Sequence, residues 1–221
     1  MTFEQMLAWD NQLGLNPDGG SVFQSAEIAE IKRLGGWEPL YRTYNGIAVT
    51  ILQKSVFYFG NFWYLPKGPG IAISSQLADM LPELRADAAK NNVFAIKIEP
   101  ELLSDAETYA QITSLGFVSS RAVQPNSSTV LVDLRPREEE ILASMNQKAR
   151  HAINRAMRDG VTAKPVIFSP TNAKIMYDLL VETAQGRFEH SLRPFDYYYK
   201  FWSTFYDTGR GSFFFAYSNG D

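Results

Sequence analysis

An Asn-Gly pair between two strand-like segments is the feature that most constrains how this chain folds. Residues 38–44 read as one strand, and residues 47–54 read as its return strand after Asn45-Gly46. Both turn positions of a tight two-residue hairpin need positive φ angles, which Asn and Gly adopt more readily than other residues. We therefore expect an antiparallel hairpin over residues 38–54.

The segments around this hairpin predict a mixed order of helices and strands. Helical spacing over 3–15 and 21–33 predicts two helices, the second with Ser25 as its N-cap and Gly35-Gly36 after its end. After the hairpin we expect a strand at 61–65, a tight loop at 66–70, a helix at 75–91, an apolar strand at 93–98 inside a sheet, a helix at 104–115 capped by Ser104 or Asp105, and strands near 118–122 and at 129–134. This order resembles the fold of the GNAT acyltransferases.

The second half repeats part of the first. We expect helices at 137–145, 146–160, 171–185 and 194–207 and strands at 161–168 and 211–217, the last entering another Asn-Gly pair at 219–220. We therefore predict an α/β (α+β) protein of tandem GNAT-like domains with central mixed sheets. The first domain would be 1–145, and 146–221 would be a linking basic helix and the N-terminal part of an incomplete second domain. The alternative is a chain that simply ends in a frayed strand.

Composition excludes several classes of function. The 221 residues contain no cysteine and only two histidines, His151 and His190, which excludes a thiolate nucleophile and a Cys- or His-rich metal site. There is no G-x-S-x-G motif for a serine hydrolase. No apolar run reaches the roughly 18 residues that cross a bilayer, and the acidic start resembles no signal peptide. We expect a cytoplasmic protein without cofactor or metal.

Residues 146–161 predict an amphipathic helix with a cationic face. The apolar side carries small or apolar residues, and the other side carries Lys148, Arg150, His151, Arg155 and Arg158. Because the whole chain has a net charge of −3, this local positive face favours a phosphate-rich partner. The alternative is a charged face that is merely solvated.

Three segments, taken together, resemble the FemABX family. Phe23-Gln24-Ser25 followed by Lys32 and Gly36-Trp37 is similar to that family's FLQS…K…GW opening. The loop that begins at Tyr64, Y-L-P-K-G-P, is similar to its Y-[LVI]-P-[RK]-G-P loop, and residues 134–161 resemble its S-M-x-x-K-x-R-x-x-I-R-x-A-x-x-x-G-V stretch. One departure is Asn154, where the family usually has Arg or Lys.

The resemblance implies an aminoacyltransferase, a non-ribosomal peptidyltransferase of the EC 2.3.2 type. Such enzymes move Gly, Ala or Ser from aminoacyl-tRNA to an amine of a peptidoglycan precursor, during synthesis of the interpeptide bridges of the cell wall. The acceptor would be UDP-MurNAc-pentapeptide or a lipid-linked precursor, and the latter would bring the protein to the membrane surface. The link at 186–193 is too short for the coiled-coil arm of some members, which implies the compact, arm-less kind.

The resemblance and the chemistry of the side chains give candidate substrate-binding residues in the first half. Lys32 would lie at the pyrophosphate of the precursor or sugar nucleotide, Tyr64 begins the second motif, and Lys67 would face a phosphate. The loop 67–72 also resembles the acyl-CoA loop of GNAT enzymes, but Pro69 has no N–H to donate to a pyrophosphate. A solvated lysine and a simple strand-to-helix turn are the alternatives.

The remaining candidates lie in the second half. Arg150 and Asn154, four residues apart, would bind substrate together, and Tyr197 or Tyr198 would stack on a uracil or sugar. Lys148, Arg155 and Arg158 suit the tRNA backbone. Aromatic core packing is the alternative for the two tyrosines.

No residue stands out as catalytic. An aminoacyl ester is already activated, so alignment of the amine and stabilisation of the oxyanion are the main requirements. Two other functions stay open: an N-acyltransferase that uses acyl-CoA, and a non-catalytic module that binds RNA or the precursor. The amino acid transferred, the tRNA isoacceptor and the oligomeric state do not follow from the sequence.

Overall fold

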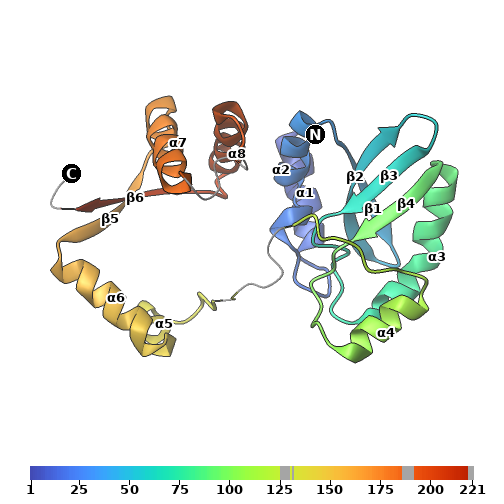
Figure 1. Ribbon diagram of the computed structural model, residues 1–221, viewed down its shortest axis with the longest axis horizontal. Coiled ribbons are helices and arrows are strands. Elements are labelled where there is room, and N and C mark those ends of the chain that lie inside the picture. The colour runs from blue at the N-terminus through green and yellow to red at the C-terminus, as the bar shows by residue number, and fades with distance from the viewer. Residues whose placement is uncertain (125–129, 131, 186–191, 219–221) are drawn as a thin grey trace. The chain divides into compact units, whose positions relative to one another are not determined.

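The chain folds as two compact units, Met1–Ser127 and Ser128–Asp221, each with its own sheet (Figure 1). The computed structural model describes residues 1–124, 130, 132–185 and 192–218. The division between the units precedes α5 (Glu138–Ser144), whereas the expected first domain extends to residue 145. The assignment of the units as GNAT-like domains stays a prediction.

The first unit is built on a mixed four-stranded sheet in the order β1-β2-β3-β4. Its strands are β1 (Glu38–Tyr44), β2 (Ile47–Val56), β3 (Gly60–Leu65) and β4 (Val93–Ile98). The predicted hairpin is confirmed, because β1 and β2 pair antiparallel and the turn residues Asn45 and Gly46 have φ angles of 46° and 79°. β4 runs parallel to β3 after the crossover helix α3 (Ser74–Lys90).

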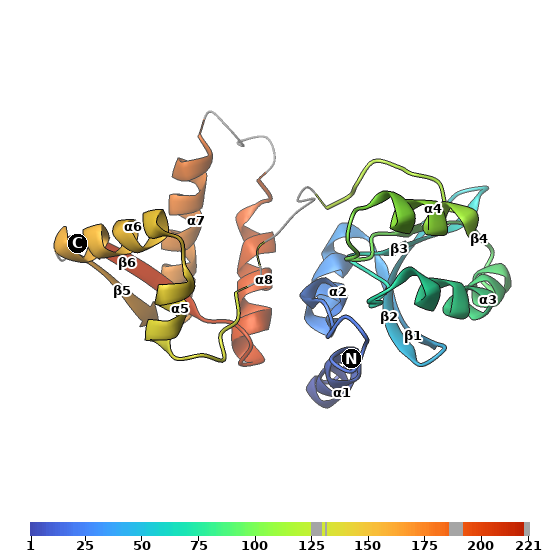
Figure 2. The same cartoon turned by 90° about the horizontal axis from the view of Figure 1, so that it is seen from below.

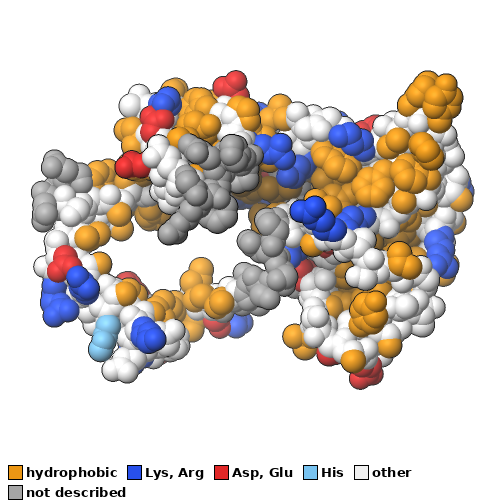
Figure 3. Space-filling model, in the orientation of Figure 1, with side chains coloured by type: hydrophobic (Ala, Val, Ile, Leu, Met, Phe, Trp, Pro, Cys, Tyr) orange, Lys and Arg blue, Asp and Glu red, His pale blue; other side chains and the backbone are white. Residues whose placement is uncertain are grey.

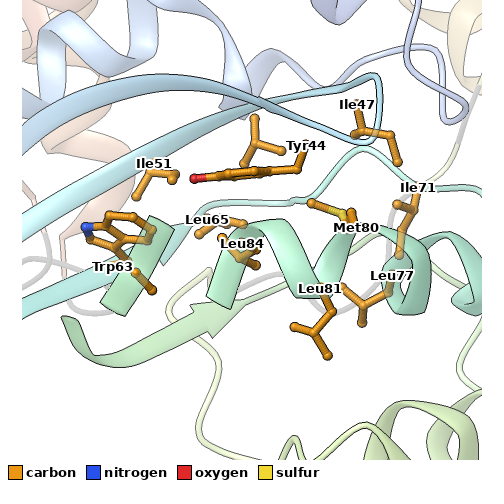
Figure 4. Close-up of a cluster of buried hydrophobic side chains, with 12 residues drawn as sticks. Tyr44, Ile47, Ile51, Trp63, Leu65, Ile71, Leu77, Met80, Leu81 and Leu84 are labelled. Atoms are coloured by element: carbon orange, nitrogen blue, oxygen red, sulfur yellow. The ribbon is translucent and has the colours of Figure 1, made fainter. Parts of the chain in front are cut away.

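Helices cover both faces of this sheet. α1 (Phe3–Leu13) and α2 (Ala26–Lys32) lie on one face and α3 on the other (Figure 2). Ser25 caps α2 as expected, since its side chain accepts a hydrogen bond from the Ile28 N–H. The largest buried cluster lies between the sheet and α3, where Ile51, Trp63, Leu65 and Leu84 pack together (Figure 4). Burial of these apolar side chains is the main term that holds the unit together.

The segment between α1 and α2 completes the hydrogen bonding of β2 beyond the point where β3 ends. The Asn16 side chain exchanges two bonds of 2.9 Å with the Ala48 backbone. The Gln24 side chain accepts from the Thr50 N–H at 2.8 Å and donates to the Pro66 carbonyl at 2.7 Å. Since these amides are buried, each side chain satisfies backbone groups that would otherwise lose their partners.

Three strand expectations need correction. β4 is an edge strand, half-buried rather than enclosed, because the residues that follow α4 (Ala106–Ser114, capped by Asp105) form no partner strand. The strand expected near 118–122 is absent. Its Ser and Arg residues have little β propensity, and the segment bonds to the Lys97 side chain of β4 instead of to the backbone of that strand. Residues 130 and 132–134 also form no strand, while 129 and 131 lie outside the described residues.

The second unit contains a two-stranded antiparallel sheet of β5 (Val161–Val166) and β6 (Phe213–Ser218). The other described elements are α5, α6 (Gln147–Arg158), α7 (Pro170–Ala184) and α8 (Phe195–Asp207). The helices lie close to their predicted positions, and the expected turn at 219–220 lies outside the described residues. Across the described chain, no helix combines the length and the apolar character needed to span a bilayer.

Candidate functional site

The parallel strands β3 and β4 bring two loops that contain charged residues to the same edge of the first sheet. Leu65 and Ile98 are register partners at the carboxyl ends of the two strands. Residues 66–73 follow β3 and residues 99–105 follow β4, before α3 and α4 respectively. Crevices at the carboxyl ends of parallel strands are the usual place for ligands in such sheets. We call this place the β3–β4 end.

A buried tyrosine and a glutamate link the two strands at this end. The Tyr64 hydroxyl, on a side chain only 2% exposed, donates to Glu99 Oε2 at 2.6 Å. The other oxygen of Glu99, Oε1, accepts from the Val123 N–H at 2.6 Å. Burial, followed by the hydrogen bond and the charge of Glu99, raises the pKa of the Tyr64 phenol well above its ordinary value. Tyr64 is therefore a neutral donor, and Glu99 is held by two donors.

Lys67 lies three residues beyond Tyr64 in a left-handed backbone conformation with a φ of 49°. Its Nζ is 3.9 Å from Glu101 Oε1, in the loop that follows β4. The side chain is 19% exposed, so its charge stands at the border of the protein interior. The β3–β4 end therefore pairs a hydroxyl and an ammonium from one strand with two carboxylates that follow the other.

Four backbone N–H groups of this loop donate to acceptors within the protein. The N–H groups of Gly68 and Ile71 donate to Leu65 and Pro69 carbonyls, and those of Ala72 and Ile73 donate to the Gln76 side chain. Pro69 has no N–H. A pyrophosphate cradle needs several such groups aimed outward. These four N–H groups and Pro69 therefore contribute no donors to such a cradle, which counts against the acyl-CoA alternative.

The two glycines of the loop permit close packing on the segment between α1 and α2. A Cβ on Gly68 would lie 2.8 Å from Gln24 Nε2, and one on Gly70 would lie 2.4 Å from Asn16 Nδ2. Both distances are shorter than carbon–nitrogen contacts allow. The first two family motifs, around Gln24 and around Gly68, are thus in direct contact with each other.

Lys32 lies in the last turn of α2, the helix that covers the face of the sheet on which Tyr64 is buried. Ala29, one turn before Lys32 and on the same helix face, packs in a buried cluster with Tyr64 and Leu52. The Trp37 ring lies 6.1 Å from the Tyr64 ring, and Lys54 Nζ lies 5.4 Å from the centre of the Trp37 ring. Tyr64 and Lys67 therefore lie at the β3–β4 end, whereas Lys32 lies in the last turn of α2, the helix that packs against Tyr64 through Ala29.

A groove of about 970 Å³ runs along β4 toward this end. Phe62, Phe94 and residues 95–100 line it from the sheet, Tyr109, Ile112 and Thr113 line it from α4, and residues 116–122 form its other wall. Lys97 Nζ holds that wall in place, since it donates to Ser120 Oγ at 2.6 Å and to the Arg121 carbonyl at 2.7 Å. Lys97 and Glu99 are two residues of this site that were not among the candidates predicted from the sequence. The sequence does contain an indication of their role, because these two charged residues stand at and just after the end of an otherwise apolar strand.

In the second unit the basic helix α6 begins at its N-cap Asn146 and bears exposed Lys148, Asn154, Arg155 and Arg158. Positively charged side chains are visible along it in Figure 3. Arg155 forms an exposed ion pair of 3.4 Å with Asp159. Lys148, Arg155 and Arg158 share one side of the helix, which keeps the proposed tRNA contacts on a single face.

Arg150, predicted as a substrate-binding residue, has structural partners within the second unit. Its Nη1 donates to the carbonyls of Ala143 and Met145 at 2.9 and 2.6 Å, at the end of α5. A cation there satisfies carbonyls left open by the helix end and favours the negative end of the dipole. Arg150 therefore joins α5 to α6 at the corner between them.

The two tyrosines of α8 lie in aromatic packing between α7 and α8. The Tyr198 ring is 5.7 Å from Tyr177 and 5.5 Å from Trp202. The Tyr197 ring is 5.8 Å from Tyr198, with the Arg193 guanidinium 5.9 Å from its centre. These contacts favour the packing alternative for Tyr198, and Tyr197 lies at the margin of the cluster. The predicted site residues thus fall in both units, and stacking on a nucleotide stays a prediction.

Comparisons with known proteins agree with this architecture. A crystal structure of FemX superposes with a TM-score of 0.70 over 98% of this chain at 20% identity. The chain spans 56% of the FemX chain. The chain therefore has the mixed α/β fold of FemX.

The FemAB family model matches residues 113–221, which include the basic helix α6. No curated protein sequence matches the chain. The family match and the FemX fold together place this chain in the FemABX family.

Proposed function

We propose that the protein containing this chain is an aminoacyltransferase that builds peptidoglycan interpeptide bridges. It would move Gly, Ala or Ser from aminoacyl-tRNA to an amine of UDP-MurNAc-pentapeptide or of its lipid-linked form, on the cytoplasmic side where charged tRNA is found. The observation that carries the proposal is the FemAB match over 113–221 combined with the FemX fold over nearly the whole chain.

The β3–β4 end supports binding of a phosphate-bearing precursor. Lys67 supplies positive charge in the loop after β3, and Lys32 supplies a second positive charge in the last turn of α2. The Tyr64–Glu99 bond holds the ends of the two strands in register. We assign Lys32, Tyr64 and Lys67 to substrate binding, together with Arg150, Asn154, Tyr197 and Tyr198 of the second unit. Lys148, Arg155 and Arg158 would bind the tRNA backbone, which positions the donor without reading its sequence.

Catalysis would follow from positioning. The amine of the acceptor attacks the ester carbonyl of the aminoacyl-tRNA, an amide bond forms, and the ribose oxygen leaves with a proton. This reaction needs alignment and oxyanion stabilisation more than a nucleophilic side chain. Among the described residues, no three His, Asp or Glu side chains gather as metal ligands.

The test is a transfer assay with the full-length protein. UDP-MurNAc-pentapeptide or lipid-linked precursor is mixed with tRNA that carries radiolabelled Gly, Ala or Ser, with labelled acetyl-CoA in parallel. We expect label to move from one tRNA to a precursor amine. Transfer from acetyl-CoA alone would overturn the proposed donor, and tRNA binding without transfer would favour the non-catalytic module.

The three residues of α6 that are assigned to tRNA give this assay a second readout. Changing Lys148, Arg155 and Arg158 together to Gln should weaken tRNA binding and flatten the slope of log affinity against log salt by about two units. The matched control is Lys174→Gln, on α7, which removes another exposed cation of the second unit. An equal loss in the control would show a general charge effect instead of a tRNA-binding face.

A further inference from the structure

The turn between β2 and β3 carries three consecutive exposed aromatic residues. Phe57, Tyr58 and Phe59, which we call the aromatic tip, are 81%, 92% and 69% exposed. Figure 3 shows hydrophobic side chains gathered at this end of the hairpin, at the upper right. Exposed apolar groups that cluster on a protein surface mark an interaction site more often than scattered ones do.

The tip is held in one conformation by its backbone. The Phe59 N–H donates to the Val56 carbonyl at 3.0 Å, and Gly60, with a φ of 100°, packs against Asn92. Tyr58 has a φ of 67°, a left-handed conformation that disfavours bulky side chains. The chain thus places a large aromatic ring at a turn position that suits Gly or Asn better. Stability of the turn does not explain that choice.

A β-bulge extends the aromatic surface from the tip along the sheet. Asn61 pairs with Val93 and Phe62 with Ala95, so Phe94 is the extra residue of β4. The Phe94 ring, 50% exposed, lies 6.0 Å from Phe59 and 6.1 Å from Phe62. Phe62 and Phe94 also line the groove that runs along β4 to Glu99. The aromatic tip is therefore continuous with the β3–β4 end.

Positive charge flanks the tip. Lys54 precedes it on β2, and exposed Lys90 lies in the last turn of α3. The residues after Lys90 reach the base of the hairpin, because the Asn91 carbonyl accepts from Asn61 Nδ2 at 2.8 Å. Aromatic rings favour the water–membrane interface, and nearby lysines favour anionic lipid headgroups. A projecting aromatic turn with flanking lysines is thus complementary to a lipid surface.

We propose that the aromatic tip, with Phe94, Lys54 and Lys90, seats the protein on an anionic lipid bilayer. A lipid-linked precursor held in that bilayer would then enter the groove along β4 toward Tyr64 and Glu99. The second statement rests on the proposed function, whereas membrane binding by the tip does not.

Vesicle cosedimentation of the full chain tests the surface. Vesicles of equal parts phosphatidylcholine and phosphatidylglycerol are compared with vesicles of phosphatidylcholine alone. The variant Phe57→Ser/Tyr58→Asn/Phe59→Ser removes the rings, and Asn suits the left-handed position of residue 58. The matched control is Leu15→Ser/Val22→Ser/Leu103→Ser, which removes three exposed apolar side chains elsewhere in the first unit.

We expect the chain to bind the anionic vesicles. The tip variant should bind them with an affinity about tenfold lower, because it loses apolar area that the bilayer would bury. The control should bind as the parent does, and Lys90→Glu should weaken only the anionic binding. Equal binding by the parent and the tip variant, or no binding by the parent, would overturn the proposal. Reversible self-association in lipid-free buffer that the tip variant abolishes would also overturn it, by assigning the tip to a second copy of the chain.

A transfer assay separates this proposal from the proposed function. The tip variant should keep its rate with UDP-MurNAc-pentapeptide and lose rate with the lipid-linked precursor in vesicles. Absence of transfer from any donor would contradict the proposed function and leave the vesicle result standing. An equal loss with both acceptors would contradict the route from bilayer to groove.

Discussion

At the scale of single residues, the Tyr64–Glu99 bond is the contact whose loss is most informative. Tyr64→Phe removes the donor and leaves a carboxylate oxygen without its partner, so we expect the free energy of unfolding to fall by about 1–2 kcal/mol. Urea denaturation near neutral pH measures this change. Tyr109→Phe, on the exposed surface of α4, is the control and should stay within about 0.5 kcal/mol of the parent. Equal stability of Tyr64→Phe and the parent would show that the bond contributes nothing.

The same residue predicts a dependence of stability on pH. Because the pKa of Tyr64 is raised in the folded chain, the unfolded chain ionises first as pH rises past about 10. The contribution of Tyr64 is fully present below that pH and is lost above it, at up to about 1.4 kcal/mol per pH unit. Tyr64→Phe should therefore lose stability less steeply between pH 10 and 11 than the parent. An unchanged alkaline slope, measured by urea denaturation at several pH values, would contradict the raised pKa.

Gly68 is the residue at which loop packing can be tested. Gly68→Ala places a Cβ against Gln24, whose side chain is buried and bonded on both sides, so the neighbour has no room to move. We expect a loss of about 1–3 kcal/mol in the free energy of unfolding. Gly14→Ala, where the added Cβ meets its nearest atom at 3.5 Å, is the control and should be neutral. Because Gly→Ala restricts the unfolded chain and so favours the folded state at both positions, a Gly68→Ala variant as stable as Gly14→Ala would show that Gln24 yields to the added Cβ.

At the scale of elements, most helices and strands follow from local pattern. The Asn45-Gly46 hairpin, the Ser25 cap of α2 and the limits of α6 depend on neighbours within a few residues, and the structure confirms them. The partners of the 118–122 segment and of Arg150 depend on where distant groups arrive in space. Lys97 comes from an adjacent strand, and Arg150 meets α5 only because Met145 turns the chain with a ψ of 152°. The spacing of residues in the sequence does not predict such tertiary contacts.

The corner between α5 and α6 gives the prediction at this scale. Arg150→Ala removes both bonds to the end of α5, so hydrogen exchange of the α5 amides should quicken by about tenfold, the equivalent of 1.4 kcal/mol. Arg155→Ala, which loses only an exposed ion pair, should leave α5 unchanged. If Arg150→Ala instead abolishes precursor or tRNA binding and leaves α5 protection intact, phosphate binding is its main role and the capping role is minor.

At the scale of the whole molecule, the two units differ in how much core each contains. The first unit has a buried cluster on both faces of its sheet, with Trp63, Leu65, Leu77 and Leu84 fully buried on one side. In the described part of the second unit, the buried apolar residues are Ala173, Ala184 and Phe213. Phe213 belongs to a cluster of aromatic rings around Phe168, whose other members are only partly buried. Folding stability scales with apolar area removed from water, so the first unit should be the more stable.

Separate expression of residues 1–127 and 128–221 tests this difference. We expect residues 1–127 to unfold in one cooperative transition. Gly68→Ala should lower their free energy of unfolding by as much as in the full chain, because Gln24 and Gly68 lie in the same unit. Residues 128–221 should keep helical circular dichroism but bind a hydrophobic dye and unfold over a broad range, because Ile167, Leu179 and Phe214 are exposed in that unit. A sharp, dye-free transition in 128–221 would show that its aromatic packing suffices for a native core. Loss of cooperativity in 1–127 would show that the buried clusters of the first unit do not hold its sheet and helices together alone.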